Sequence, residues 1–276
     1  MTAKILLVIP CYNESGRIGP FLSELCALAE PLGSTSILVV EDGSSPEEQD
    51  RLRELVNATR MKYPFVREPL LLSSNLGKGG AVYAGWLAHQ SEEWLGFVDA
   101  DGACSASETV RLARLLIGGQ TSVDAIFASR IQMLGHRIQR HLHRHIIGRI
   151  YATIVSILLD IPVHDSQCGL KFIRRSAYAR VFPTLEVKDF GFDIELMAAL
   201  TDSGAIIEEM PIDWHEVRGG KLRLFRDALC MLGDVLQVRR RRRMASWLAH
   251  LKGSTGAHLE GTSLSRKQGL PPSRNV

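Results

Sequence analysis

Residues 94–102 have the sequence WLGFVDADG, in which a five-residue apolar run ends in two aspartates and a glycine. A short apolar run without polar alternation is typical of a strand that is buried on both faces in a parallel sheet. Similar runs occur at 5–9, 37–40 and 123–128. Stretches with helical periodicity separate these runs, at 18–30, 46–59, 79–90 and 105–117. This alternation predicts an α/β fold with a doubly wound, mostly parallel sheet.

The composition is that of an ordinary globular protein of 276 residues, with 45% hydrophobic and 23% charged residues. Such a chain can bury one sizeable core, and neither wholesale disorder nor a fibrous repeat is expected. The net charge of +3 is uneven, because nine basic residues and one acidic residue follow position 238. A mildly acidic body with a basic C-terminal end argues against a nucleic-acid partner. It favours a local anionic partner near the C-terminus.

The cysteine pattern and the apolar runs bear on where the protein works. Five widely spaced cysteines without a Cys-x-x-Cys pair predict reduced thiols in a cytosolic compartment. The apolar run Ile5–Ile9 is too short for a secretory signal, and no apolar run approaches the roughly 20 residues that cross a bilayer. We therefore expect a cytoplasmic protein without a signal peptide or transmembrane helix, which meets a membrane only peripherally, at its surface.

The aspartates of the DADG sequence indicate a metal site. Asp99 and Asp101 follow a buried strand and can face one crevice once the chain turns, and Gly102 lets the backbone approach closely. A hard divalent cation such as Mg2+ takes oxygen ligands and is commonly held by one or two carboxylates together with substrate phosphates. Asp-x-Asp also occurs by chance. It is the position after a buried strand that favours a cation site.

A glycine-rich stretch, NLGKGGA at 75–81, opens one of the expected helices and contains Lys78. Exposed N–H groups, the positive end of the helix dipole and a lysine together form an anion site. The spacing is not that of a Walker A loop, and a flexible loop with a solvated lysine is the alternative. A cation and this cradle together would stabilise the charge that develops on a departing diphosphate. The residues therefore indicate a nucleotide-activated donor.

The motifs at the ends of these strands resemble those of family 2 glycosyltransferases with the GT-A fold. They are VIPCYNE at 8–14, VVEDGS at 39–44, NLGKGGA at 75–81, DADG at 99–102 and SR at 129–130. Three later motifs are similar to the polyprenyl-phosphate branch, and in particular to dolichyl-phosphate beta-glucosyltransferases. These are DSQCGLKF at 165–172, FGFDIE at 190–195 and PIDWHE at 211–216. The resemblance covers about residues 4–242 in order.

The resemblance implies roles for individual residues. Those expected to bind the nucleotide sugar are Pro10, Tyr12, Glu14, Asp42, Lys78 and Asp99. The residues expected to be catalytic are Asp101, Arg130, Gln167 and Lys221. The last three would face the sugar or the phosphates where donor and acceptor meet. A divalent cation, Mg2+ or Mn2+, is expected on Asp99 and Asp101. Asp165 and Asp193 lie in the same motifs, and the resemblance leaves their roles open.

The activity that the resemblance implies is inverting transfer of a hexose from a nucleotide sugar to a polyprenyl or dolichyl monophosphate at a membrane surface. Glucose from UDP-glucose is favoured, because Gly102 and Ala103 stand where mannosyl relatives often carry a glutamine ligand. A GDP-mannose-dependent polyprenyl-phosphate mannosyltransferase and transfer to a saccharide acceptor are alternatives. A non-catalytic module that binds nucleotide sugars or membranes is another, but retention of Asp99, Asp101 and Lys78 favours an enzyme.

The chain is expected to have three parts. These are a GT-A domain over 1–221, a basic amphipathic helix over 222–243 and a disordered tail over 244–276. Within the first part, 143–160 is predicted to form a further amphipathic helix. Both helices suit an interfacial position, with Arg239–Arg243 near anionic headgroups, but they equally suit a position that covers the core.

Overall fold

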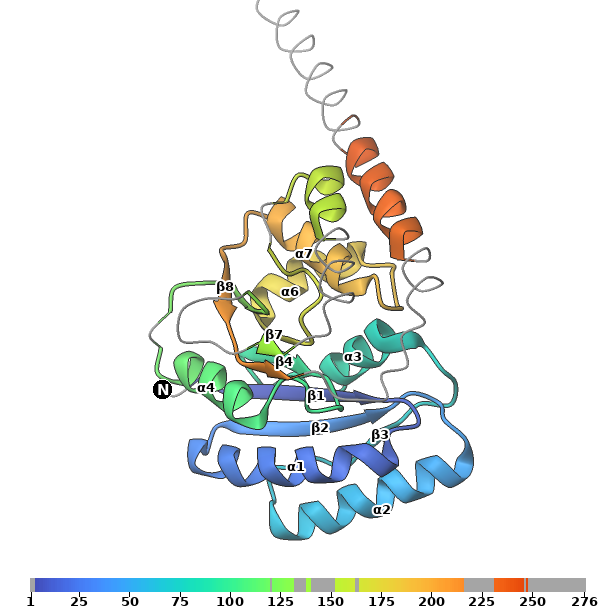
Figure 1. Ribbon diagram of the computed structural model, residues 1–276, viewed down its shortest axis with the longest axis vertical. Coiled ribbons are helices and arrows are strands. Elements are labelled where there is room, and N and C mark those ends of the chain that lie inside the picture. Colours follow the sequence, from blue (N-terminus) through green and yellow to red (C-terminus); the bar gives the residue numbers. More distant parts are fainter. Residues whose placement is uncertain are drawn as a thin grey trace, which may run out of the picture. The chain divides into compact units, whose positions relative to one another are not determined.

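The computed structural model describes residues 3–119, 121–131, 138–139, 152–161, 164–215, 231–245 and 247. The chain forms two compact units, Met1–Val235 and Leu236–Val276. The first unit contains the main sheet (Figure 1). Its strands are β1 (Ile5–Cys11), β2 (Thr35–Glu41), β3 (Leu70–Leu71), β4 (Trp94–Val98), β5 (Ala125–Ser129), β7 (Leu170–Arg174) and β8 (Ile207–Pro211).

The described strands form a seven-stranded sheet in the order β3-β2-β1-β4-β7-β5-β8. Strand β7 runs antiparallel to its neighbours β4 and β5, whereas the other adjacent strands are parallel. The predicted α/β fold with a mostly parallel sheet is therefore confirmed. A small parallel pair of β6 (Ile138–Gln139) and β9 (Trp214–His215) lies outside this sheet.

Helices cover both faces of the sheet (Figure 1). They are α1 (Ser15–Ala29), α2 (Pro46–Lys62), α3 (Gly77–Ala88), α4 (Ala106–Ile117), α6 (Arg175–Val181) and α7 (Phe192–Asp202), with short 3-10 turns η1 (Glu30–Leu32) and η2 (Phe182–Thr184). Helices α1, α2 and α4 pack together on one face, and α3 contacts β1, β2 and α7 on the other. Every residue of β4 is buried, as expected for a strand that is covered on both sides.

The first turns of two helices follow directly from the local sequence. The hydroxyls of Ser45 and Ser105 accept hydrogen bonds from the N–H groups of Glu48 and Glu108, which satisfies N–H groups that have no partner within their helix. Pro46 occupies the first turn of α2, where its missing N–H costs no hydrogen bond. These caps fix where α2 and α4 begin, next to the ends of β2 and β4.

Only part of the two predicted amphipathic helices lies in the described residues. Residues 152–159 and 231–245 are helical. Positions 143–151, positions 222–230 and the predicted boundary at 221 lie outside the described residues, as do 248–276. In the described part of the chain, no helix combines the length and the apolar character that crossing a bilayer requires.

Candidate functional site

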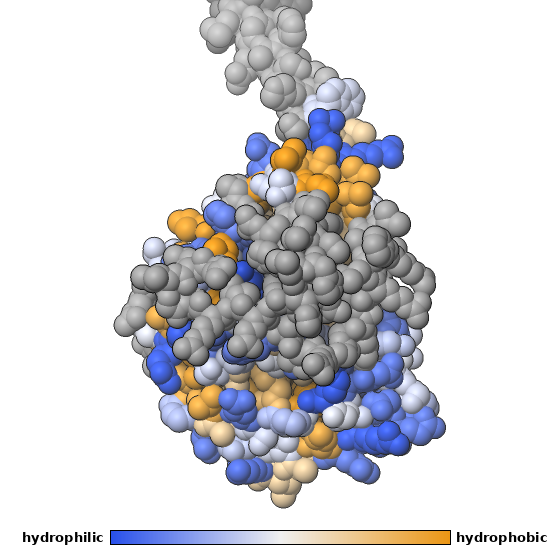
Figure 2. Space-filling view, in the orientation of Figure 1, coloured by the Kyte–Doolittle hydropathy of each residue, from blue (hydrophilic) through white to orange (hydrophobic). Residues whose placement is uncertain are grey.

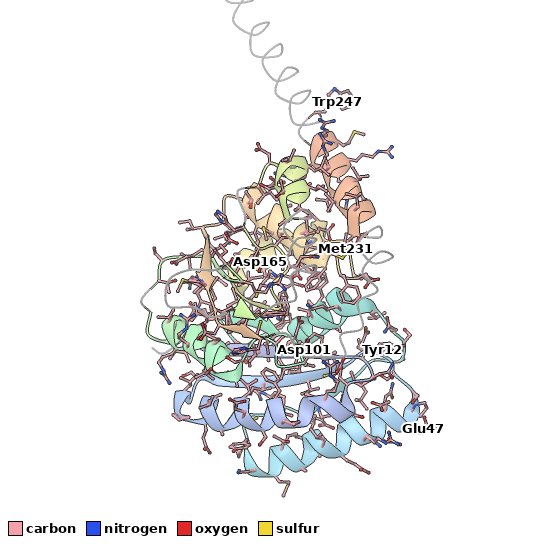
Figure 3. All side chains as sticks on the ribbon, in the orientation of Figure 1. Tyr12, Glu47, Asp101, Asp165, Met231 and Trp247 are labelled. Atoms are coloured by element: carbon pink, nitrogen blue, oxygen red, sulfur yellow. The ribbon has the colours of Figure 1, made fainter. Side chains whose placement is uncertain are left out.

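Three polar loops begin at the same edge of the sheet. Strand β1 pairs in parallel with β2 on one side and with β4 on the other, so the carboxyl ends of all three strands point the same way. The residues that follow these ends include Tyr12, Asp42 and Asp101. Tyr12 and Asp101 both lie above α1 in Figure 3. This edge is where open α/β sheets bind their ligands.

The loop after β1 leads into α1 through a tight turn. Tyr12 is 44% exposed, and Asn13 has a φ of 51°, in the left-handed region that asparagine tolerates better than most residues. The N–H of Asn13 donates to the hydroxyl of Ser44 at 2.9 Å, which joins this loop to the one after β2. The carboxylate of Glu14 lies 3.3 Å from the guanidinium of Arg17 in the first turn of α1.

Two neighbouring carboxylates at the end of β2 have different partners. Glu41 is almost fully buried and accepts hydrogen bonds from the N–H groups of Gly43 and Ser44 at 3.0 and 2.9 Å, so it fixes the turn. Asp42 Oδ1 accepts from the N–H of Leu76 at 2.7 Å, which ties β2 to the start of α3. Burial raises the pKa of Asp42 to about 6.

Lys78, in the first turn of α3, pairs with an aspartate of the DADG sequence. Its Nζ atom lies 2.7 Å from Oδ1 of Asp99. The ammonium group also lies 5.3 Å from the ring centroid of Phe97 and 5.8 Å from that of Phe192. Although burial lowers it, the charges of Asp99 and Asp193 raise the pKa of Lys78 above its ordinary value. Lys78 is therefore a cation at neutral pH.

The backbone at Gly169 also lies against Asp99, beside Oδ2, whereas Lys78 pairs with Oδ1. The N–H of Asp99 donates to the carbonyl oxygen of Gly169 at 2.9 Å. A Cβ atom on Gly169 would overlap the carboxylate of Asp99, so a larger residue here would force that carboxylate to move. Asp99 is thus fixed between the backbone before β7 and the ammonium group of Lys78.

Asp101 completes a cluster of half-buried charges with Lys78 and Asp99. Its Oδ1 atom accepts a hydrogen bond from the N–H of Ala103 at 2.9 Å. The pKa of Asp101 is raised above its ordinary value, chiefly by burial and then by the charge of Asp99. The Ala103 N–H, Lys78 and Arg17 act in the opposite direction but do not cancel this rise. Excess negative charge between two such carboxylates favours a cation. Two carboxylates are a ligand set that Mg2+ accepts, because it keeps its other positions for water and phosphate. Among the described residues, no group of three or more metal-ligating side chains is found.

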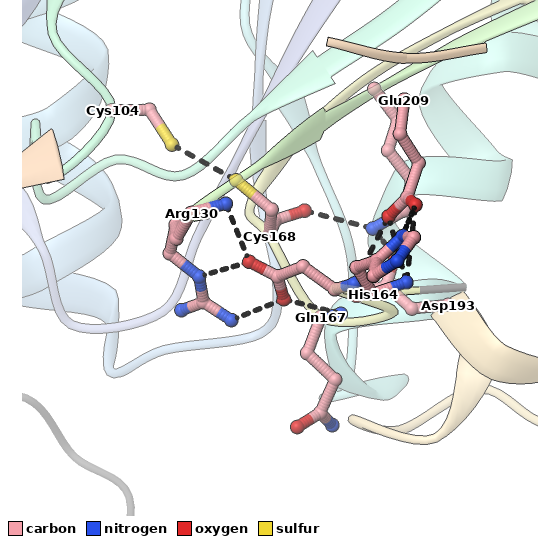
Figure 4. Close-up of polar contacts among 9 residues, drawn as sticks. Cys104, Arg130, His164, Gln167, Cys168, Asp193 and Glu209 are labelled. Carbon is pink, nitrogen blue, oxygen red and sulfur yellow. Dashed lines mark hydrogen bonds and ion pairs between the residues drawn. The ribbon is translucent and has the colours of Figure 1, made fainter. Parts of the chain in front are cut away.

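Arg130, which follows β5, forms a two-pronged ion pair with Asp165. Its backbone N–H and Nε donate to Oδ2 at 2.9 and 2.6 Å, and Nη2 donates to Oδ1 at 2.7 Å (Figure 4). Nη1 has no hydrogen-bond partner in the described part of the chain. The guanidinium lies 5.6 Å from the ring centroid of Trp214.

Two buried thiols, Cys104 and Cys168, lie near this ion pair (Figure 4). Their sulfur atoms are 3.8 Å apart and form no disulfide.

Gln167 lies in the same loop as Asp165, directly before β7. Its backbone N–H donates to Oδ1 of Asp165 at 3.3 Å, and its side-chain amide reaches the sulfur of Met231 at 3.7 Å. Because Gly169 follows two residues later, this loop joins the Arg130 ion pair to Asp99. Lys221, the remaining expected site residue, lies outside the described residues.

Some residues of this region have no role in the sequence-based prediction. Gly169 limits the space beside Asp99, and Lys171 forms a buried ion pair with Asp193 at 2.9 Å. A signal for the ion pair exists in the sequence, because Lys171 is a charged residue within the largely apolar stretch 170–173. No comparable signal exists for the close approach at Gly169, because glycine is common in loops.

Comparison with known proteins defines the class. A family model described as "Glycosyl transferase family 2" matches residues 6–182. The chain therefore belongs to glycosyl transferase family 2, and the predicted family and enzyme class are confirmed.

Within this family, the chain is similar to relatives with a more specific name. A dolichyl-phosphate beta-glucosyltransferase of Saccharomyces cerevisiae is 33% identical over 246 residues, which cover 84% of this chain and 73% of the relative. One of Homo sapiens is 29% identical over 257 residues, with coverages of 89% and 78%. Among solved structures, Mycobacterium tuberculosis glucosyl-3-phosphoglycerate synthase with Mn2+, UDP and glucosyl-3-phosphoglycerate has a TM-score of 0.61 at 15% identity. That match covers 86% of this chain and 80% of the synthase, and it shows a shared fold.

The contact between Gly169 and Asp99 leads to a first prediction. We expect Gly169→Ala to lower glycosyl transfer by about 100-fold, because the new methyl group must displace a carboxylate from its position. Activity and thermal unfolding of the purified variant are the measurements. Gly16→Ala is the matched control, since a Cβ atom there meets nothing within 4 Å. Equal activity of both variants would contradict the importance of this contact.

Proposed function

We propose that the protein transfers glucose from UDP-glucose to a dolichyl or related polyprenyl monophosphate, with inversion at the anomeric carbon. The observation that carries this proposal is the cluster of Lys78, Asp99 and Asp101 at the carboxyl edge of the sheet. Relatives named dolichyl-phosphate beta-glucosyltransferase, 28–33% identical, support the sugar, the acceptor and the β-linked product.

The nucleoside is assigned to the loops after β1 and β2. Pro10 lies near the end of β1, Tyr12 and Glu14 follow in the first loop, and Asp42 supplies a carboxylate from the second. The hydrogen bond between the loops and the bond from Leu76 to Asp42 hold these loops in place, which reduces the ordering that binding requires.

The diphosphate is assigned to Lys78, with a divalent cation on Asp99 and Asp101. Glycosyltransferases of the same fold have been crystallised with UDP and Mn2+ or Mg2+. When bound, such a cation supplies positive charge to the oxygens of the leaving diphosphate. Lys78 adds its own charge there and is already fixed beside Asp99. Lys78 is in place before the reaction, so it needs little reorganisation as negative charge develops.

The acceptor determines what else the site must do. A phosphate monoester has a second pKa of about 6 and is mostly dianionic at neutral pH, so no general base has to remove a proton. A phosphate oxygen attacks C1 of glucose, and the C1–O bond to UDP breaks with its electron pair going to the diphosphate. The remaining tasks are alignment of the two reactants and compensation of their mutual repulsion.

Arg130, Gln167 and Lys221 are assigned to the place where the two substrates meet. The pairing with Asp165 leaves Nη1 of Arg130 for an acceptor phosphate, and the fixed fork geometry of the guanidinium suits such an anion. Gln167 lies in the same loop and supplies an amide for a sugar hydroxyl or phosphate oxygen. Lys221 would add a second cation.

Contact with a membrane surface is proposed because the acceptor is a lipid. In the helix 152–159, Ile157 is 74% exposed and Ile154 lies beside it at the surface, whereas Val155 and Leu159 are buried. The second unit presents a stripe of apolar and basic side chains, which are exposed except for the partly exposed Arg239. Hydrophobic and hydrophilic residues lie side by side there in Figure 2. The stripe consists of Leu236, Arg239, Arg240, Arg243, Met244 and Trp247. Such a mixture is typical of helices that lie in an anionic lipid interface.

The central test is transfer of labelled sugar to a short polyprenyl phosphate. UDP-glucose should be the preferred donor over GDP-mannose and other sugar nucleotides, and a chelator should abolish transfer until Mg2+ or Mn2+ is added back. Asp101→Asn should lower turnover by about 100-fold, because it replaces a charged ligand of the cation with a neutral amide. Asp50→Asn, on the exposed side of α2, is the control. Transfer that survives Asp101→Asn and the chelator would refute the proposed mechanism.

The raised pKa of Asp42 predicts a pH dependence. Below a pH of about 6 the carboxyl group gains a proton and loses its charge, so binding of UDP-glucose should weaken as the pH falls through this value. The diphosphate of UDP-glucose does not titrate in this range. Calorimetry between pH 5 and 8 measures the effect, and Asp42→Asn should bind with the same affinity at every pH. A pH dependence that persists in this variant would assign the titration to another group.

Peripheral attachment can be measured with lipid vesicles. Removing three arginines by R239A/R240A/R243A should weaken binding to phosphatidylserine-containing vesicles by about 100-fold, since each contributes roughly 1 kcal/mol near an anionic surface. High salt should release the unmodified protein in the same way. R51A/R53A/K62A on α2 removes the same formal charge and should bind normally. Equal loss in both triple variants would indicate a nonspecific charge effect and not a defined interfacial stripe.

A further inference from the structure

Two lysines lie over the same aromatic ring beside the candidate donor site. Nζ of Lys78 and Nζ of Lys171 lie 5.3 and 5.5 Å from the ring centroid of Phe97. Each lysine has its own carboxylate, Asp99 at 2.7 Å for Lys78 and Asp193 at 2.9 Å for Lys171. Two pairs of opposite charge are therefore packed around one ring.

The burial of Lys171 is unusual for a lysine. It is the second residue of β7, a strand with neighbours on both sides, and its side chain is 0% exposed. Its Nζ atom also donates to the carbonyl oxygen of Cys168 at 2.8 Å. Removing an ammonium group from water is costly, and an apolar pair of similar volume is often as stable as a buried ion pair. Stability alone therefore does not account for this ion pair.

Asp193 also acts on Lys78. It lies in the first turn of α7 and is 3% exposed, and its negative charge is the second carboxylate, after Asp99, that raises the pKa of Lys78. The neighbouring Phe192 ring is 5.8 Å from Nζ of Lys78. Lys78 is therefore paired with Asp99 and also lies in the field of Asp193, whose own partner Lys171 shares the Phe97 ring with Lys78.

We infer that Lys171 is a positioning residue for donor binding. By pairing with Asp193, it prevents this carboxylate from drawing Lys78 away from Asp99 and from the diphosphate of the donor. Without Lys171, the buried charge of Asp193 would lack its partner, and Lys78 is the cation that can replace it. This inference rests on the proposed function, because it takes Lys78 to be the ligand of the diphosphate.

The test compares binding of UDP and of uridine, which lacks phosphate, to the full-length protein. Calorimetry with Mn2+, below the unfolding temperature of every variant, gives the dissociation constants. Lys171→Met should weaken UDP binding by about tenfold, the typical effect of losing a hydrogen bond to a charged group, and should leave uridine binding unchanged. In a Lys78→Met background, Lys171→Met should cause no further loss, because its effect acts through Lys78.

The double variant K171M/D193L provides an independent test, and it applies also if Lys171→Met alone does not fold. It removes both charges and leaves an apolar pair, so UDP should bind within about threefold of the unmodified protein. Equal weakening of UDP and uridine, additive losses with Lys78→Met, or tenfold weaker UDP binding by K171M/D193L would each overturn the inference. If the unmodified protein itself failed to bind UDP, the proposed function would be wrong, and the inference with it.

Discussion

The antiparallel pairing of β7 with β4 is the constraint on which the site depends. This pairing sets Gly169 against Asp99 and places Lys171 opposite Phe97. Because β7 enters the sheet at the edge where the parallel strands end, the loop before it reaches Arg130 as well. A parallel strand in the same place would have its preceding loop at the far end of the sheet. The direction of one strand thus joins the expected donor residues to the expected acceptor residues.

Much of this organisation follows from simple features of the sequence. The apolar runs at 5–9, 37–40 and 94–98 correspond to buried strands, and Pro46 marks the start of α2 as expected. Parallel strands joined by helices must end at one edge, so the polar residues after each run could be grouped into one site before any geometry was known. The pairing of Lys78 with Asp99 agrees with that grouping.

Other features depend on information that a local pattern does not carry. The stretch 170–174 is apolar enough to form a strand, but its direction and its place between β4 and β5 are set by tertiary packing. The ion pair of Arg130 with Asp165 joins residues 35 positions apart, and that of Lys171 with Asp193 joins a strand to a helix. Spacing rules apply within one element, so they do not reveal such partners.

The position of β7 within the sheet has a consequence for synthesis of the chain on the ribosome. Strands β4 and β5 both emerge well before the strand that lies between them. Until residues 170–174 have left the exit tunnel, each nascent strand has an edge of unpaired N–H and C=O groups, a surface on which chains tend to aggregate. A nascent polypeptide that ended before β7 would therefore be an expected client of chaperones that bind exposed β-edges.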